Sequence, residues 1–152
     1  MLNIALTSLR YYKLVVTDTT APATKYIAYR YAEFSYNIEN GTQLSPDDKR
    51  IEYFGNWKIE NHLSTFGHNY VGENIELKFN FNGSQFAIMS FAGEKISSFD
   101  VYIDGKKFDT ISNIANEEAN KIVFLSNVLN DGEHEIKIKT KGSFNLDSII
   151  IW

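Results

Sequence analysis

The stretch Asn74–Asn82, NIELKFNFN, decides the fold class of this chain. Apolar side chains alternate along it with charged or amide side chains. The apolar members are Ile75, Leu77, Phe79 and Phe81. Alternation with a period of two is typical of a β-strand with one buried face and one wet face. The stretch therefore predicts a strand that lays one side on a hydrophobic core.

Strands of the same kind follow one another along the chain. The predicted ranges are Ser84–Phe91, Ser98–Ile103, Lys106–Ile111, Ile122–Val128, Glu133–Thr140 and Ser143–Trp152. The helix-compatible stretch Asn113–Lys121 is short and polar, so we expect a loop there with at most one helical turn. Successive strands with short polar connections predict an all-β fold, an antiparallel β-sandwich.

Glycine-containing turns separate these strands. Asp104–Gly105 predicts a hairpin, because Asp-Gly tolerates the positive φ angles of a tight turn. Asp131–Gly132 predicts a second hairpin by the same argument. Asn82–Gly83 and Lys141–Gly142 are expected to end two of the other strands.

The first forty-five residues differ from the remainder. Tyr26–Tyr36 is dense in aromatic and β-branched residues, which favour strands, and we expect another strand at Lys13–Val16. Asn40–Lys49 has no apolar periodicity and is predicted to be a linker. We therefore expect two parts, with a strand pair and linker in residues 1–45 and the sandwich in residues 46–152. The first part is too short to bury its own core, so we expect it to pack on the sandwich or on a neighbouring subunit.

Composition excludes several classes of function. The 152 residues include no cysteine, which excludes disulfides, thiolate metal sites and a cysteine nucleophile. The formal net charge of −4 argues against a nucleic-acid partner, because a phosphate backbone requires a basic face. No apolar run approaches the roughly 18 residues of a membrane span, and no secretory signal is visible, so no membrane insertion is expected.

Five short motifs in the second part occur in the order found in one known kind of module. They are Gly55–Trp57, Phe79–Gly83, Val101–Gly105, Leu129–His134 and Phe144–Asp147. The segment from Arg50 onward resembles the galactose-binding-like jelly-roll carbohydrate-binding modules found beside SGNH-type esterase domains. The resemblance implies a jelly-roll β-sandwich, further domains in a parent chain, and cell-surface carbohydrate as the partner.

The N-terminal part carries a looser resemblance. Leu9–Tyr36 is similar to the closing strands of a discoidin-type domain, which end in an Arg-Tyr-x-x-Leu strand and a later Ala-Glu-hydrophobic strand. Aromatic β-modules without cysteine are also similar to tail and baseplate proteins of phages that infect Gram-positive bacteria. That similarity implies an extracellular or virion-associated location and a homo-oligomer such as a trimer.

The candidate ligand-binding residues lie in and beside a predicted loop, Glu60–Glu73. They are Trp57, Phe66, His68 and Tyr70. Sugar recognition needs an aromatic ring against the apolar face of a pyranose and polar groups for its hydroxyls, and this set offers both. The alternative is that Trp57 fills the core and the loop merely crosses one end of the sandwich.

Acidic side chains near turns offer oxygen ligands for a structural calcium. They are Asp104, Asp131, Glu133 and Asp147. Turn chemistry alone explains an aspartate before a glycine, and Asp147 has the alternative of accepting hydrogen bonds from backbone amides of the last strand. No other cofactor is predicted.

The histidines are not expected to bind a metal. The spacing of His62 and His68 differs from that of a helical zinc motif, and no third ligand is indicated. His134 belongs to a turn motif, so we expect it to pack or to form hydrogen bonds near a hairpin.

The sequence predicts a protein that is not an enzyme, because it has no Gly-x-Ser-x-Gly motif, no phosphate-binding glycine loop and no metal motif.

Tyr29 and Tyr31 are candidate interface residues, since tyrosine is enriched at protein interfaces. The apolar end Ile149–Trp152 would seek a partner if one of its faces were uncovered. Two functions therefore stay open: a carbohydrate-binding module, or a structural oligomerisation module of a phage tail or baseplate with no sugar ligand.

Overall fold

A computed structural model describes residues 41–61, 64–93, 96–112 and 119–152. Every regular element in these ranges is a strand, and every pairing between them is antiparallel. The all-β prediction is confirmed. Over the same ranges, no helix is long and apolar enough to cross a membrane. The predicted N-terminal strands, Tyr29, Tyr31, His62 and most of the predicted loop at 113–121 lie outside the described residues.

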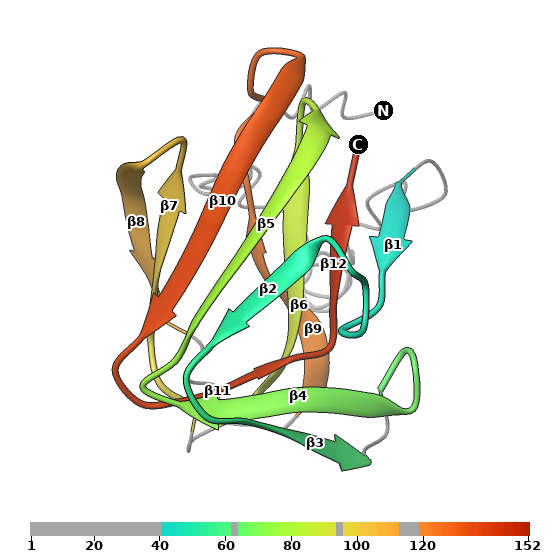
Figure 1. Ribbon diagram of the computed structural model, residues 1–152, viewed down its shortest axis with the longest axis vertical. Helices are drawn as coiled ribbons and strands as arrows, with labels where there is room; N and C mark the ends of the chain where they lie inside the picture. Colours follow the sequence, from blue (N-terminus) through green and yellow to red (C-terminus); the bar gives the residue numbers. More distant parts are fainter. Residues whose placement is uncertain (1–40, 62–63, 94–95, 113–118) are drawn as a thin grey trace, which may run out of the picture.

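One sheet has five strands in the order β2, β5, β10, β7 and β8 (Figure 1). Their bounds are β2 Ile51–Phe54, β5 Glu76–Gly83, β10 Gly132–Thr140, β7 Phe99–Ile103 and β8 Lys106–Ile111. The alternation predicted for β5 is confirmed, because its apolar side chains are at most 3% exposed while Asn80 and Asn82 are exposed.

A second sheet has four strands in the order β1, β12, β6 and β9. Their bounds are β1 Thr42–Leu44, β12 Ser148–Ile151, β6 Phe86–Ala92 and β9 Ala119–Leu125. β1 falls inside the stretch predicted to be a linker, yet it pairs with β12 and so belongs to the sandwich. Ile149 and Ile150 of β12 are fully buried, and the strand lies between β1 and β6. The end of the chain therefore needs no external partner strand.

A third sheet of three strands closes one end of the sandwich, at the bottom of Figure 1. Its order is β11 Ser143–Leu146, β4 His68–Glu73 and β3 Trp57–Asn61. The loop predicted at Glu60–Glu73 is wrong over most of its length, because β3 and β4 pair as a hairpin from Trp57↔Gly72 to Asn61↔His68. The many polar side chains favour a loop in the sequence, but four of the five residues of β3 are exposed, so a strand accommodates them.

The two Asp-Gly predictions have opposite outcomes. Asp104 and Gly105 have φ angles of 51° and 75° and join β7 to β8 as a hairpin, as predicted. The hairpin predicted at Asp131–Gly132 is wrong, because β9 pairs with β6 while β10 pairs with β5 and β7. The chain crosses between the two large sheets at this turn. A turn sequence specifies a change of direction but not the sheet that the next strand joins.

Asp147 divides the predicted last strand into β11 and β12, which belong to different sheets. Its side chain is fully buried and accepts hydrogen bonds from the Thr65 amide at 2.8 Å and the Thr65 hydroxyl at 2.7 Å. The Ser148 hydroxyl donates to the same carboxylate at 3.1 Å. Asp147 therefore accepts a backbone amide, as predicted, but that amide belongs to the β3–β4 connection and not to the last strand.

Phenylalanine rings fill the space between the large sheets. Phe86 of β6 lies 5.6 Å from Phe79 and 5.3 Å from Phe124, measured between ring centroids. Phe99 and Phe144 meet edge to face at 5.0 Å where the core reaches the small sheet. Full burial of one such side chain stabilises the fold by about 2 kcal/mol, so these contacts hold the three sheets together.

Candidate ligand-binding groove

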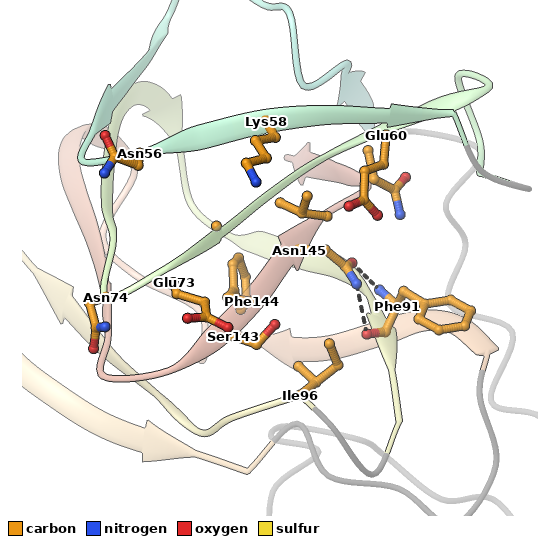
Figure 2. Close-up of a pocket in the computed structure, with 13 residues that line it drawn as sticks. Asn56, Lys58, Glu60, Glu73, Asn74, Phe91, Ile96, Ser143, Phe144 and Asn145 are labelled. Carbon is orange, nitrogen blue, oxygen red and sulfur yellow. Dashed lines mark hydrogen bonds between the residues drawn. The ribbon is translucent and has the colours of Figure 1, made fainter.

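A groove of about 710 Å³ lies over one face of the three-stranded sheet (Figure 2). The strands contribute Lys58 and Glu60 from β3, Asn69, Val71 and Glu73 from β4, and Ser143 and Asn145 from β11. Figure 2 shows Lys58 and Glu60 along one side of the groove and Ile96 at the other. The lining therefore combines polar side chains held on regular strands with apolar surface from Val71, Phe91, Ile96 and Phe144.

Strand alternation explains which side chains reach the groove. Lys58 lies opposite Val71, and Glu60 lies opposite Asn69, so these positions share one face. The intervening residues of the same hairpin, including Trp57 and Tyr70, point to the other face. The side chains selected from the sequence and the side chains of the groove thus alternate along the same two strands.

Asn69 and Asn145 are the buried polar side chains among the described residues that line the groove, and they differ in their hydrogen bonds. Asn69 is 2% exposed, and its Oδ1 atom has no hydrogen-bond partner within the described part of the chain. A buried acceptor without a partner costs about 1–3 kcal/mol, because it has lost its water without replacement. The atom has almost no exposed surface, so a ligand group that donates a hydrogen bond to it must first displace a neighbouring side chain.

The side-chain amide of Asn145, by contrast, forms hydrogen bonds within the fold. Its Oδ1 accepts hydrogen bonds from the Phe91 amide at 2.6 Å and the Ser90 hydroxyl at 3.2 Å, and its Nδ2 donates to the Phe91 carbonyl at 3.2 Å. Figure 2 shows the bonds to Phe91 as dashed lines. Asn145 ties β11 to β6 and thereby fixes this wall of the groove.

The charged side chains of the groove leave it slightly acidic. One lysine and two glutamates line it, so its formal charge is −1. Lys58, Glu60 and Glu73 are all exposed to solvent.

Three of the four residues selected from the sequence lie together on the opposite face of the hairpin. Tyr53 of β2 joins them, with its ring centroid 4.8 Å from that of Trp57 and 4.8 Å from that of Tyr70. His68 lies 6.2 Å from Tyr70. Phe66, at 40% exposure, lies in the β3–β4 connection, and its carbonyl oxygen is 3.2 Å from His68 Nδ1.

The polar ends of this aromatic cluster have partners within the protein. The Tyr70 hydroxyl donates to Asp47 Oδ1 at 2.8 Å, which raises the pKa of Tyr70. His68 Nε2 lies 2.7 Å from Asp47 Oδ2, within ion-pair distance, although the nitrogen makes no hydrogen bond with the described residues. Trp57 Nε1 donates to the Phe54 carbonyl at 3.1 Å, and the Tyr53 hydroxyl donates to the Pro46 carbonyl at 2.8 Å. Burial is the main cause that raises the pKa of Tyr53. The cluster thus fastens the hairpin to residues 46–54.

His134 has the structural position that its turn motif predicts. Its Nδ1 lies 2.8 Å from Asp104 Oδ2 and its Nε2 lies 2.8 Å from the Asn130 carbonyl oxygen. Both partners are acceptors, so this arrangement favours the protonated ring, in which both ring nitrogens donate. The Asn130 carbonyl, and next Asp104, raise the pKa of His134. The Glu135 amide donates to the other carboxylate oxygen of Asp104 at 3.0 Å.

The four acidic side chains predicted as calcium ligands lie within the described residues. The described ranges hold no group of three or more histidine, aspartate or glutamate side chains that could bind a metal ion. Asp104 and Asp147, two of the four calcium candidates, accept hydrogen bonds from protein donors.

No protein-family model matches this sequence, and no curated protein matches it. Solved structures match its fold. A family two carbohydrate esterase from Cellvibrio japonicus is 18% identical with a TM-score of 0.53, over 73% of this chain and 33% of the esterase. A two-domain esterase active on acetylated mannans is 13% identical with a TM-score of 0.54, over 74% of this chain and 36% of the esterase.

The CBM36-1 domain of a multidomain xylanase, from the hindgut metagenome of Trinervitermes trinervoides, is 17% identical with a TM-score of 0.50. The match covers 74% of this chain and 97% of that domain. This chain thus spans about a third of the length of the two esterases but nearly all of the CBM36-1 domain. At these identities the likeness establishes the fold, which is the predicted antiparallel jelly-roll β-sandwich.

Proposed function

We propose that this chain is a non-catalytic carbohydrate-binding module that holds a cell-surface glycan in the groove over β3, β4 and β11. The observation that carries the proposal is the unpaired Oδ1 of Asn69, buried in a groove of about 710 Å³. Sugar hydroxyls supply the hydrogen-bond donors that such an atom lacks, and Val71, Phe91 and Ile96 offer contact to the apolar faces of sugar rings.

The fold relatives support the same class of ligand. One of them is a CBM domain, where CBM stands for carbohydrate-binding module. One of the esterases was crystallised with mannopentaose. An open groove of this kind buries little of a sugar, so we expect an affinity in the range of roughly millimolar to micromolar per site. Several linked copies would raise the overall affinity through effective concentration.

The aromatic cluster is the competing location for the glycan. It comprises Tyr53, Trp57, His68 and Tyr70, and Phe66, which is 40% exposed, lies in the adjacent β3–β4 connection. We favour the groove because the polar ends of Trp57 and Tyr70 are already bound to the protein, whereas Asn69 Oδ1 is not.

Calorimetric titration with cellohexaose, mannopentaose and xylo-oligosaccharides distinguishes the two locations. Val71→Phe fills the floor of the groove and is expected to abolish binding. Tyr70→Phe is the matched control, since it removes one hydroxyl from the opposite face of the same strand and is expected to bind normally. If Val71→Phe binds normally while Phe66→Ala and His68→Ala do not, the glycan occupies the aromatic cluster.

An assembly role is the second candidate function, and the exposed apolar side chains of the β3–β4 hairpin favour it. Ile59 is 61% exposed and Phe66 is 40% exposed. On this proposal the chain is a structural module of a phage tail or baseplate, forms a homotrimer and binds no sugar. Light scattering would then give a trimer mass at every concentration, unchanged by any glycan. If the chain binds a glycan and does not hydrolyse a chromogenic acetyl ester, the first candidate function is supported instead.

A further inference from the structure

The buried end of the groove restricts the hydrogen-bonding character of its ligand. Oδ1 of an asparagine is an acceptor and cannot donate. The group that reaches Asn69 must therefore be a hydroxyl or an N–H group. A ligand carboxylate, sulfate or ether oxygen at the same place would leave Asn69 Oδ1 unpaired and would add a second buried acceptor beside it.

The carboxylates of the groove lie toward its two ends. Glu60 is directly opposite Asn69, and Glu73 is four residues farther along β4, so the two ends are about 13 Å apart along the strand. Figure 2 shows Glu60 and Glu73 at opposite sides of the view, with Lys58 between them. A ligand with a carboxylate on every sugar can pair with Lys58 once but also faces a like charge near each end.

We infer that the groove selects an uncharged glycan, through a sugar hydroxyl or amide N–H that donates to Asn69 Oδ1, and that it rejects polyanionic glycans. This inference rests on the proposed function. Asn145 does not compete for this role, since its amide is already bonded to Phe91 and Ser90. Asn69 is thus the specificity-determining residue of the groove.

The first test replaces Asn69 by leucine, which keeps the approximate volume and removes the acceptor. We expect the affinity of the whole chain for cellohexaose or mannopentaose to fall about tenfold or more, while the melting temperature stays the same or rises. Asn82→Leu is the matched control, because Asn82 is an exposed asparagine on β5 of another sheet. A variant Asn69→Leu that binds like the wild type, or that melts at a lower temperature, overturns the inference.

The second test compares the neutral oligosaccharides with an oligogalacturonate of similar length. We expect the wild type to bind the neutral ligands at least about tenfold more tightly than the oligogalacturonate. The double variant Glu60→Gln, Glu73→Gln is expected to show a smaller difference in affinity. Equal or tighter binding of the oligogalacturonate overturns the inference.

The two proposals fail in different ways. If the wild type binds no glycan, or if Val71→Phe does not weaken binding, the groove is not a glycan site and both proposals fall. If Val71→Phe abolishes binding but either Asn69→Leu or the charge of the glycan leaves the affinity unchanged, the proposed function stands. The inference about selectivity is then wrong.

Discussion

Asp147 is the residue on which the junction between the small sheet and the sandwich depends. Its buried carboxylate accepts both the amide and the hydroxyl of Thr65, 82 residues away in the sequence. Asp147→Ala removes these acceptors, so we expect the free energy of unfolding to fall by about 2 kcal/mol. Chemical denaturation measures the loss. The exposed Asp131→Ala is the control and should change stability by less than about 0.5 kcal/mol. A loss for Asp147→Ala as small as the control's would contradict this account of the junction.

The ion pair of His134 with Asp104 predicts a pH dependence of stability. The fold raises the pKa of His134, so this contribution is complete below the ordinary histidine value near 6.5 and is lost as pH rises through the raised pKa. The His134 hydrogen bond lowers the pKa of Asp104, so the aspartate's contribution is present above its ordinary value of 3.8 and is lost as pH falls through the lowered pKa.

Both contributions are therefore present together near pH 5. Asp104 is 52% exposed, so the pair contributes only about 0.5 kcal/mol. We expect the stability difference between wild type and His134→Gln to be largest near pH 5 and to shrink toward pH 9. Denaturation at several pH values checks this, with Lys139→Gln, on the same strand, as a control. A difference that grows with pH would rule out the protonated ring.

At the scale of elements, the β3–β4 hairpin shows which features of the site could be predicted from the sequence and which could not. Its aromatic positions were selected from the sequence, and Trp57, His68 and Tyr70 do lie together. The groove positions between them were missed because the segment was interpreted as a loop. Had a hairpin been recognised, alternation alone would have placed Lys58, Glu60, Asn69 and Val71 on one face. The unpaired Oδ1 of Asn69 is a tertiary feature that no local pattern reports.

Two glycines allow the connections between sheets to be tested. Gly83 and Gly132 have similar φ angles, 159° and 155°. A Cβ atom on Gly83 would overlap the Trp152 carbonyl oxygen, which accepts the Ser84 amide at 2.7 Å, whereas a Cβ atom on Gly132 would meet nothing within 4 Å. Both alanine variants carry a backbone cost, but Gly83→Ala adds an overlap and should lose about 2 kcal/mol more. Thermal denaturation compares them, and equal losses would contradict the close approach.

At the scale of the whole molecule, the all-β class could be predicted from the sequence but the strand order could not. Period-two alternation reports which face of a strand is buried and gives no information on its neighbour. β5 pairs with β2 and β10, and β1 pairs with β12 over a separation of about a hundred residues. The groove has the same origin, because β11 pairs with β4 in the small sheet and the chain then passes at Asp147 into the four-stranded sheet.

A glycan that binds the folded chain must also stabilise it, which connects the groove to the whole molecule. A ligand that binds only the folded state at a hundred times its Kd adds about 2.7 kcal/mol to the free energy of unfolding. For a chain of this size, that raises the melting temperature by roughly 8 °C. We expect this rise for wild type and Asn82→Leu with a neutral oligosaccharide, and none for Val71→Phe. A rise that Val71→Phe retains would place the bound glycan outside the groove, whatever the affinity.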